Sequence, residues 1–253
     1  AIGYNSGTYD CYMNGLIDEV KIYNYALTED EVKLDYNRSA SSNIGVLSKN
    51  TGNTAPNTAQ SQAYCIPGDT STCLPPIAEY NFEEGTGTTA YDTSGNGNNA
   101  RFNNGTPNWK SGKIGKAINL NGTQDLILGT GTSLDLGTAQ SISVWAKKAD
   151  TNEQIILGSD GNMYAFDFVS NKIYYSNTHN VSWTYNSSNW SNWHHYEITR
   201  NGTSVTLYID GISQGTLTLG VNDNWNYKFI GSAGSWKWNG QIDQLRIYNY
   251  ART

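Results

Sequence analysis

Asn239-Gly240-Gln241-Ile242-Asp243-Gln244-Leu245-Arg246-Ile247-Tyr248 closes this chain, and the stretch Asn14-Gly15-Leu16-Ile17-Asp18-Glu19-Val20-Lys21-Ile22-Tyr23 near its start is nearly the same. An internal repeat of this kind indicates repeated modules. The second copy ends a segment that begins near Pro76, whereas residues 1–37 are too few to bury a core of their own. We therefore expect residues 1–37 to be the last strands and trailing helix of a preceding repeat, followed by one whole module.

The composition favours a β-sheet protein whose partner is neither nucleic acid nor membrane. The 253 residues include 26 glycines, 18 tyrosines and 8 tryptophans, which favour short strands and many turns over helices. The net charge is −6 with 16 lysines and arginines, so we expect no basic face that could neutralise phosphates. No run approaches the roughly 18 apolar residues that a membrane helix requires. We therefore expect neither a nucleic-acid partner nor insertion into a membrane.

Short segments of alternating apolar and polar residues recur after residue 76, between turns rich in glycine and asparagine. This alternation predicts β-strands, and Asn201-Gly202 and Asp210-Gly211 are strong hairpin sequences. Many short strands without intervening helices predict an all-β, antiparallel two-sheet sandwich of the jelly-roll type. Strands are expected at 77–82, 117–121, 126–128, 141–147, 154–157, 163–169, 172–176, 194–200, 204–210 and 241–248. One short helix is expected from the capping box at Thr28 through about Asn37.

Residues 38–76 have the composition of a linker. They are rich in Ser, Asn, Thr, Ala, Gly and Pro and contain few large apolar residues. Cys65 and Cys73 bracket a short turn-forming loop, and a disulfide between them is sterically reasonable and fits an oxidising compartment. Cys11 is left over, and we interpret it as a half-buried thiol. The whole module is then residues 77–253.

Six blocks of sequence follow one another through the rest of the chain. In order they are Ala78–Asn98, Gly115–Gly122, Ser141–Lys147, Trp193–Arg200, Val205–Gly211 and the closing strand with Ile242-Asp243. Together they resemble bacterial laminin G-like jelly-roll domains of the concanavalin A-like lectin/glucanase superfamily. Residues 1–37 resemble only the last strands and trailing helix of such a domain. The resemblance implies the fold, whereas the superfamily includes carbohydrate-binding modules, adhesion domains, glycoside hydrolases and polysaccharide lyases.

Asp243 and Asp92 are candidate ligands of a cation. Asp243 is expected to share a strand face with Leu245 and Ile247, and a carboxylate on an apolar face needs a partner. Asp92 begins the turn Asp-Thr-Ser-Gly-Asn-Gly, which can present several oxygens, and such sites suit Ca²⁺. Related jelly rolls often carry a calcium between an N-terminal loop and the last strand, so the resemblance implies a structural calcium held by Asp92, Asn96 and Asp243. The alternative is that Asp243 caps a loop by accepting backbone N–H bonds.

The tryptophans divide into two groups. Tryptophan is usual in the family at the positions of Trp145 and Trp193, which implies core packing for both. Four others stand in polar, loop-like sequence, namely Trp183, Trp190, Trp225 and Trp236. Exposed rings beside short amides and hydroxyls suit sugars, because a ring face packs on the C–H face of a pyranose. We therefore expect these four to bind a glycan; the alternative is that they cover sheet ends or join subunit contacts.

Glu197 and Asp167 are the candidates for catalysis. Glu197 is expected to share the polar face of its strand with His195 and Thr199, and Asp167 lies in the middle of an expected strand. Two carboxylates that face each other about 5 to 9.5 Å apart can hydrolyse a glycosidic bond. The Glu-x-Asp-x-x-Glu strand typical of the superfamily's retaining glucanases does not occur in the sequence. An exposed strand glutamate is more often a solvated residue, so we expect binding rather than catalysis.

These observations predict a secreted or cell-surface module that binds a polysaccharide or other glycan and carries a structural calcium. The first alternative is a glycoside hydrolase, endo-acting on a β-glucan or a related polysaccharide, with Glu197 and Asp167 as its carboxylates. The second is an adhesive or filament-forming surface protein that self-associates when residues 1–37 donate strands to a neighbouring chain.

Overall fold

The computed structural model describes residues 4–6, 10–12, 74–129, 131, 133–160, 163–176 and 181–252. The chain divides into two compact units, Ala1–Pro75 and Pro76–Thr253. In the first unit, β1 (Tyr4–Ser6) pairs antiparallel with β2 (Asp10–Tyr12), and Asn5 lies opposite Cys11. The helix predicted at 28–37 and the cysteines predicted to form a disulfide, Cys65 and Cys73, lie outside the described residues, as does most of the predicted linker.

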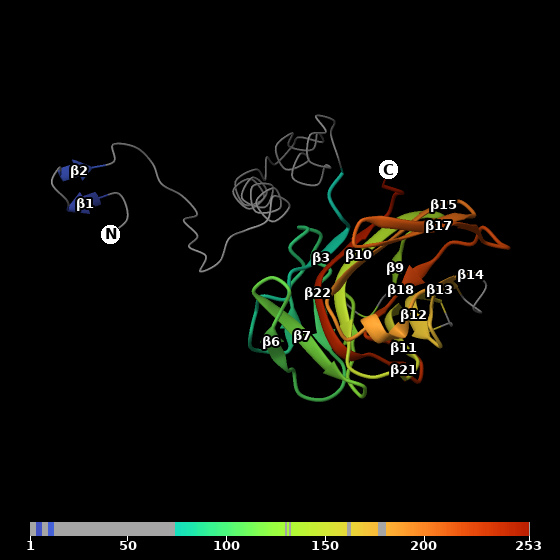
Figure 1. The fold of residues 1–253 in the computed structure, drawn as a ribbon, viewed down its shortest axis with the longest axis horizontal. Coiled ribbons are helices and arrows are strands. Elements are labelled where there is room, and N and C mark those ends of the chain that lie inside the picture. The colour runs from blue at the N-terminus through green and yellow to red at the C-terminus, as the bar shows by residue number, and fades with distance from the viewer. Residues whose placement is uncertain are drawn as a thin grey trace. The chain divides into compact units, whose positions relative to one another are not determined.

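Two antiparallel sheets of eight strands each build the second unit, which confirms the all-β sandwich (Figure 1). The first sheet has the order β17-β16-β15-β10-β22-β7-β6, with β3 also paired to β22. Its strands are β3 (Ala78–Tyr80), β6 (Trp109–Ser111), β7 (Lys116–Asn121), β10 (Ala139–Lys148), β15 (His194–Asn201), β16 (Ser204–Ile209), β17 (Ile212–Thr218) and β22 (Asn239–Tyr248).

The second sheet has the order β14-β13-β12-β11-β19-β8-β5-β4. Its strands are β4 (Thr89–Ala90), β5 (Ala100–Phe102), β8 (Leu126–Ile127), β11 (Gln154–Gly158), β12 (Tyr164–Val169), β13 (Lys172–Ser176), β14 (Val181–Thr184) and β19 (Phe229–Ile230). Two short two-stranded sheets complete the unit: β9 (Leu134–Asp135) with β18 (Asn226–Tyr227), and β20 (Ser232–Ala233) with β21 (Trp236–Lys237).

Helical structure in the described part of the chain is confined to one 3₁₀ turn, η1 (Ser187–Asn189). No helix of this described part is long and apolar enough to cross a membrane.

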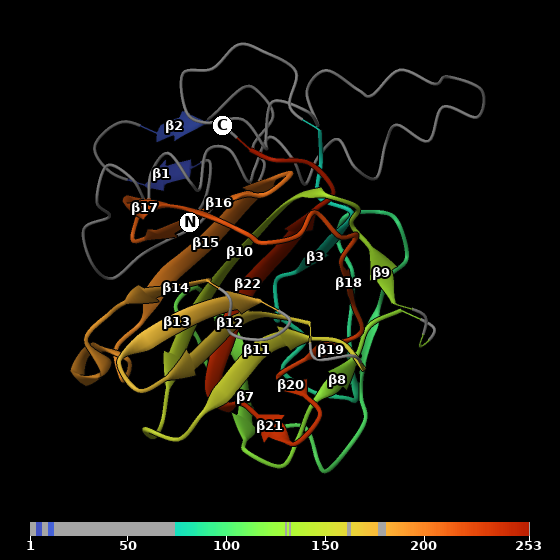
Figure 2. The same cartoon turned by 90° about the vertical axis from the view of Figure 1, so that its right-hand side faces the viewer.

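The core lies between the two sheets, which form separate layers in both views (Figure 2). Strand β10 shows how the sequence builds it, because Ile142, Val144 and Ala146 alternate toward the interior and are fully buried. From the other sheet, Phe168 contacts the rings of Trp190, Tyr196 and Trp238 edge-on, with centroids 5.1–5.4 Å apart. The residues that leave β10 on its other side therefore occupy the outer face of the first sheet.

Both predicted hairpins are confirmed. Asn201-Gly202 lies between β15 and β16, where Asn201 pairs with Ser204. Asp210-Gly211 joins β16 to β17, and both residues have positive φ, 51° and 78°. Two successive positive φ angles are what the tight turn of a two-residue hairpin requires, and Asp-Gly tolerates them. These hairpins place β15, β16 and β17 side by side on one flank of β10.

Candidate functional site

The outer face of the first sheet carries rows of polar and aromatic side chains. On β10, Ser141, Ser143, Trp145 and Lys147 alternate with the buried core residues and so point outward. Neighbouring strands continue each row, since residues paired across strands point to the same face. Trp145, for example, lies between His195 on β15 and Asp243 on β22.

Trp145 is half-buried on this outer face rather than in the core. Its ring centroid lies 5.4 Å from that of His195, with the two planes tilted by 58°. Lys113, from the loop between β6 and β7, places its Nζ atom 4.6 Å from the centre of the indole. A second pair of the same kind lies beside it, because the Nζ atom of Lys147 is 5.2 Å from the ring of Trp193. We call Lys113, Trp145, Lys147, Trp193 and His195 the tryptophan patch.

A loop held by Asp243 brings Lys113 to the tryptophan patch. The backbone N–H of Ile114 donates to Oδ2 of Asp243 at 2.9 Å. Gly112 lies so close that a Cβ atom there would be 2.6 Å from Oδ2 of Asp243 and 2.5 Å from the carbonyl oxygen of Lys116, which no real side chain tolerates. The buried carboxylate and the glycine together fix where the loop crosses the sheet.

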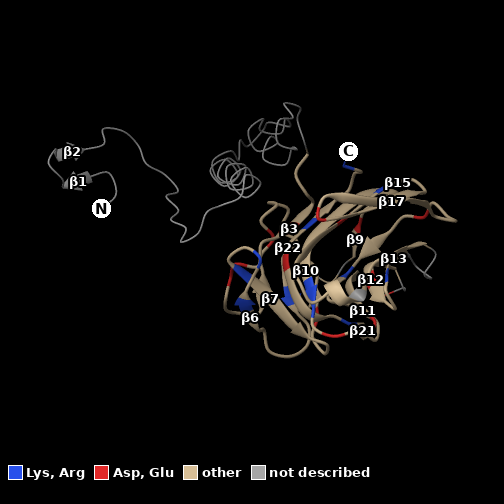
Figure 3. Cartoon of the chain, in the orientation of Figure 1, with Lys and Arg blue, Asp and Glu red and all other residues tan. Residues whose placement is uncertain are grey.

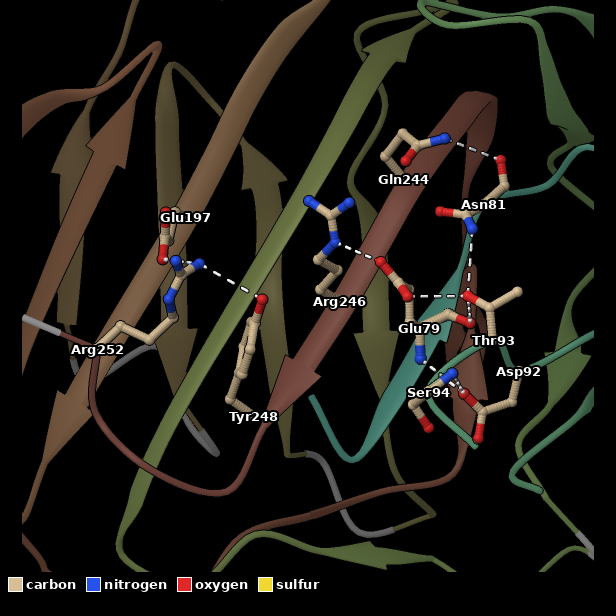
Figure 4. A network of polar contacts seen from close by, with 10 residues as sticks. All are labelled: Glu79, Asn81, Asp92, Thr93, Ser94, Glu197, Gln244, Arg246, Tyr248 and Arg252. Carbon is tan, nitrogen blue, oxygen red and sulfur yellow. Dashed lines mark hydrogen bonds and ion pairs between the residues drawn. The ribbon is translucent and has the colours of Figure 1, made fainter. Parts of the chain in front are cut away.

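Next to the tryptophan patch, an ion pair joins β22 to β3. Nε of Arg246 donates to Oε1 of Glu79 at 2.7 Å, and the hydroxyl of Thr93 donates to Oε2 of the same carboxylate at 2.9 Å (Figure 4). Both oxygens of Glu79 are thus engaged, and the charge of Arg246 is matched.

The end of the chain folds back onto the same face. The backbone N–H of Arg252 donates to Oγ of Ser141 at 2.8 Å, and that hydroxyl donates to the carbonyl oxygen of Tyr250 at 3.0 Å. This turn brings Nη1 of Arg252 to 3.6 Å from Oε1 of Glu197, while its guanidinium lies 4.8 Å from the ring centre of Tyr248 (Figure 4). Glu197 therefore shares a partly exposed ion pair.

Burial and two arginines set the protonation of this face. Burial lowers the pKa of His195 to about 4, and the nearby charges of Arg246 and Arg252 act in the same direction, against Asp210. Burial raises the pKa of Glu197 above its usual value, while Arg252 and Arg246 oppose that rise. Near neutral pH, the imidazole of His195 is therefore uncharged beside Trp145.

We expect this neutral histidine to make stability depend on pH. An unfolded histidine titrates at a pKa of about 6.5, so between that pH and about 4 the unfolded chain binds a proton that the folded chain does not. The free energy of unfolding should therefore fall as pH falls through this window. Thermal melts at about pH 7 and about pH 5 should show a larger drop for the wild type than for His195→Gln. Equal drops for the two proteins would contradict the assignment.

The structure reverses the expected roles of most tryptophans. Trp183, Trp190 and Trp225 are only 5%, 2% and 1% exposed, so the expectation that their rings are exposed is wrong. Trp183 alternates inward on β14 and donates from its Nε1 atom to the carbonyl oxygen of Gly215 at 2.9 Å. Trp236, on β21, is 37% exposed and remains a candidate for contact with a ligand. Trp145 and Trp193, for which the family resemblance implied core packing, are instead half-buried at the surface.

Glu197 and Asp167 do not face each other. Glu197 points outward from the first sheet, because its neighbours Tyr196 and Ile198 fill the core. Asp167 is fully buried on β12 of the second sheet. Burial of Lys148 lowers the pKa of that lysine to about 8. The negative charge of Asp150, and after it that of Asp167, opposes this fall. The predicted pair of carboxylates across one cleft is therefore not assembled.

The predicted calcium ligands fall in two places. Oδ1 of Asp92 accepts the backbone N–H groups of Glu79 and Ser94, both at 2.9 Å, and Oδ2 accepts that of Asn98 at 2.8 Å. Asn96 lies in the same turn and directs its amide nitrogen to the carbonyl oxygen of Ile77 at 3.1 Å. N–H donors thus contact both oxygens of Asp92, whereas Asp243 binds the loop between β6 and β7. A calcium shared by the three side chains stays a prediction.

A β-bulge explains why Asp243 is not on the face expected for it. Ser143 pairs with Arg246 and Trp145 with Asp243, so β22 has two residues where β10 has one. Gln244, inside this bulge, has a φ of 50°. The extra residue reverses the alternation, which leaves Leu245 in the core and Asp243 on the outer face under the loop. Asp243 thus accepts a backbone N–H, as the alternative interpretation predicted.

Among the described residues, no group of three or more His, Cys, Asp and Glu side chains could hold a metal ion. Self-association through residues 1–37 concerns a segment of which only β1 and β2 are described. The sequence did contain a sign of the tryptophan patch, since Trp145 stands between Val144 and Ala146, two residues that strand alternation sends to the core.

Comparison with known proteins agrees with this architecture. A laminin G model of the concanavalin A-like lectin/glucanases superfamily matches residues 120–253, whereas no curated protein matches the chain significantly. Domain 4 of AbnA, a GH43 extracellular arabinanase from Geobacillus stearothermophilus solved with arabinotriose, is 23% identical over 71% of this chain and 94% of that one, with a TM-score of 0.49.

Two toxin structures have the same fold. The binding domain of botulinum neurotoxin DC, solved in complex with SialylT, is 16% identical with a TM-score of 0.51, and the match covers 71% of this chain and 49% of that one. Botulinum neurotoxin type C, whose cell entry depends on two ganglioside molecules, is 16% identical with a TM-score of 0.50 and the same coverage. This chain thus spans about half of each toxin chain. Since the family model covers more than half of the sequence and the two-sheet sandwich agrees with it, the chain belongs to the concanavalin A-like lectin/glucanase superfamily.

Proposed function

We propose that this module binds a glycan at the tryptophan patch. The observation that carries the proposal is Trp145, a large ring half-buried on an outer sheet face and surrounded by polar side chains. An indole face can pack on the C–H face of a sugar, while hydroxyl, amide and charged groups meet its hydroxyls. Lys113 and Lys147 over the two indoles, and Glu197 in the row beside Trp145, supply such groups.

The shared fold supports a sugar as the class of ligand. Botulinum neurotoxins DC and C, which have this fold, are described with SialylT and with gangliosides. A glycan ligand also fits a secreted or cell-surface location for this module, and we propose that location together with glycan binding. A structural calcium is a separate proposal that binding at the tryptophan patch does not require.

Binding to a panel of soluble polysaccharides, measured by affinity electrophoresis, tests the proposal. We expect Trp145→Ala to weaken binding at least tenfold, about 1.4 kcal/mol, because the ring is the platform. Trp236→Ala is the matched control, since it removes an exposed tryptophan from a different part of the fold. A melting temperature of Trp145→Ala close to that of the wild type would show that the variant is folded.

The reverse pattern, in which Trp236→Ala loses binding and Trp145→Ala retains it, would contradict the proposal and move the site to β21. The same incubations, assayed for reducing ends, address the alternative of a glycoside hydrolase. Release of reducing ends that Glu197→Gln abolishes would establish catalysis without the second carboxylate predicted from the sequence.

A further inference from the structure

We propose that the glycan is anionic and that Lys113 and Lys147 hold its acidic groups. This inference rests on the proposed function of the tryptophan patch and names the class of its ligand. The chemistry is that of a uronate carboxylate or a sulfate ester on a sugar whose C–H face packs on an indole.

The two lysines of the tryptophan patch carry charges that no described carboxylate matches. The ion pairs among the described residues involve other lysines, Lys228 with Asp160 and Lys237 with Asp125. Lys113 and Lys147 instead lie over the indoles of Trp145 and Trp193. An ammonium over an exposed ring is weakly held, so each lysine can move aside and pair with an anion when a sugar takes the ring face.

The two arginines on this face are already paired. Arg246 pairs with Glu79 at 2.7 Å, and Arg252 lies 3.6 Å from Glu197. The carboxylate of Asp243 is buried beneath the loop that carries Lys113 and accepts the N–H of Ile114. Lys113 and Lys147 are therefore the cations of the tryptophan patch that are left to meet an anionic ligand.

These lysines stand in a chain that is acidic as a whole, with a net charge of −6. Exposed Lys110 on β6 adds a third lysine on the same outer face, opposite Ala117 of β7. Figure 3 shows the blue segments of lysine and arginine gathered where β6, β7 and β10 lie. The field of these lysines would attract an anionic ligand.

The loop that carries Lys113 is fixed by specific backbone contacts. Asp243 and Gly112 hold the loop across the sheet, and Gly115, with a φ of 58°, turns the chain back into β7. Buried contacts therefore fix the backbone of the loop that carries Lys113 beside Trp145.

The test measures binding of the full chain to two acidic polymers and their neutral counterparts by isothermal titration calorimetry. Polygalacturonate is compared with its methyl ester, and dextran sulfate with dextran, so that each pair differs in charge. The variants are the double substitution Lys113→Gln with Lys147→Gln, the single Trp145→Ala, and the control Lys172→Gln. Lys172 is exposed on the second sheet, with its Nζ atom 5.9 Å from the ring of Tyr174.

We expect at least one acidic polymer to bind tenfold or more tightly than its neutral counterpart, and the acidic polymer that binds identifies carboxylate or sulfate. The double lysine variant should lose tenfold or more of that affinity, the control should lose none, and added salt should weaken binding of the wild type. Equal binding of the acidic and neutral polymers, no binding of either acidic polymer, or full binding by the double variant would overturn the inference.

These outcomes separate the inference from the proposed function. If neutral polymers bind through Trp145 and the lysines have no effect, glycan binding stands and the preference for anions fails. If acidic polymers depend on the lysines but bind Trp145→Ala as well as the wild type, the lysines attract anions without a sugar platform, and the proposed function fails.

Discussion

Replacing Trp225 by alanine is expected to lower the free energy of unfolding by about 3–5 kcal/mol, the range for removing a large buried aromatic side chain. The ring is 1% exposed and stacks on Tyr175, with centroids 4.2 Å apart and planes within 15°. The guanidinium of Arg200 lies 5.0 Å from the centre of the same ring. The substitution would leave a cavity and remove the aromatic partner of a fully buried cation.

Urea unfolding of Trp225→Ala and Trp225→Phe provides the measurement. Phenylalanine keeps a ring against Tyr175, so Trp225→Phe should lower the free energy of unfolding clearly less than Trp225→Ala does. A change below about 1 kcal/mol for alanine, together with lost glycan binding, would show that Trp225 is an exposed platform after all.

Asp92→Ala is expected to cost about 3 kcal/mol or more, because the carboxylate accepts three backbone N–H groups that would lose their acceptor. These bonds tie the turn after β4 to Glu79 of β3 and to Asn98. Asp92→Asn keeps one acceptor oxygen, so it should lie between alanine and the wild type in stability.

Melting temperatures in EDTA and in excess calcium decide how Asp92 acts. If hydrogen bonding explains the role of Asp92, Asp92→Ala lowers the melting temperature by the same amount in both solutions. A wild-type melting temperature that falls in EDTA, with no such fall for Asp92→Ala, would instead place a structural calcium at Asp92.

The alternating pattern of apolar residues predicted the strands of the sandwich, and Asn201-Gly202 and Asp210-Gly211 predicted its two tight hairpins. Strands such as β10 and β15 have one face in the core, so apolar residues recur at every second position of their sequences. The same pattern places Trp145 outside the core. Family resemblance indicated the opposite, because it assigns a tryptophan to a position without saying which face of the sheet needs it.

Polar surroundings in the sequence were a poor guide to exposure. Trp190 follows Ser-Ser-Asn and yet is buried, because the 3₁₀ turn before it leaves Ser188 and Asn189 exposed and turns the ring inward against Phe168. Neighbours along the chain report the environment of a loop residue only when the loop stays in solvent. Here the loops close over the ends of the sheets.

The repeated stretch at residues 14–23 and 239–248 determined, by itself, that this chain contains a strand of alternating pattern and one whole β module. Tertiary structure alone decided what its aspartate does. The bulge at Gln244 sends Asp243 to the outer face, where it binds the loop that carries Lys113. A bulge depends on pairing with β10, a strand about 100 residues earlier in the chain, so no local pattern in the closing stretch can reveal it.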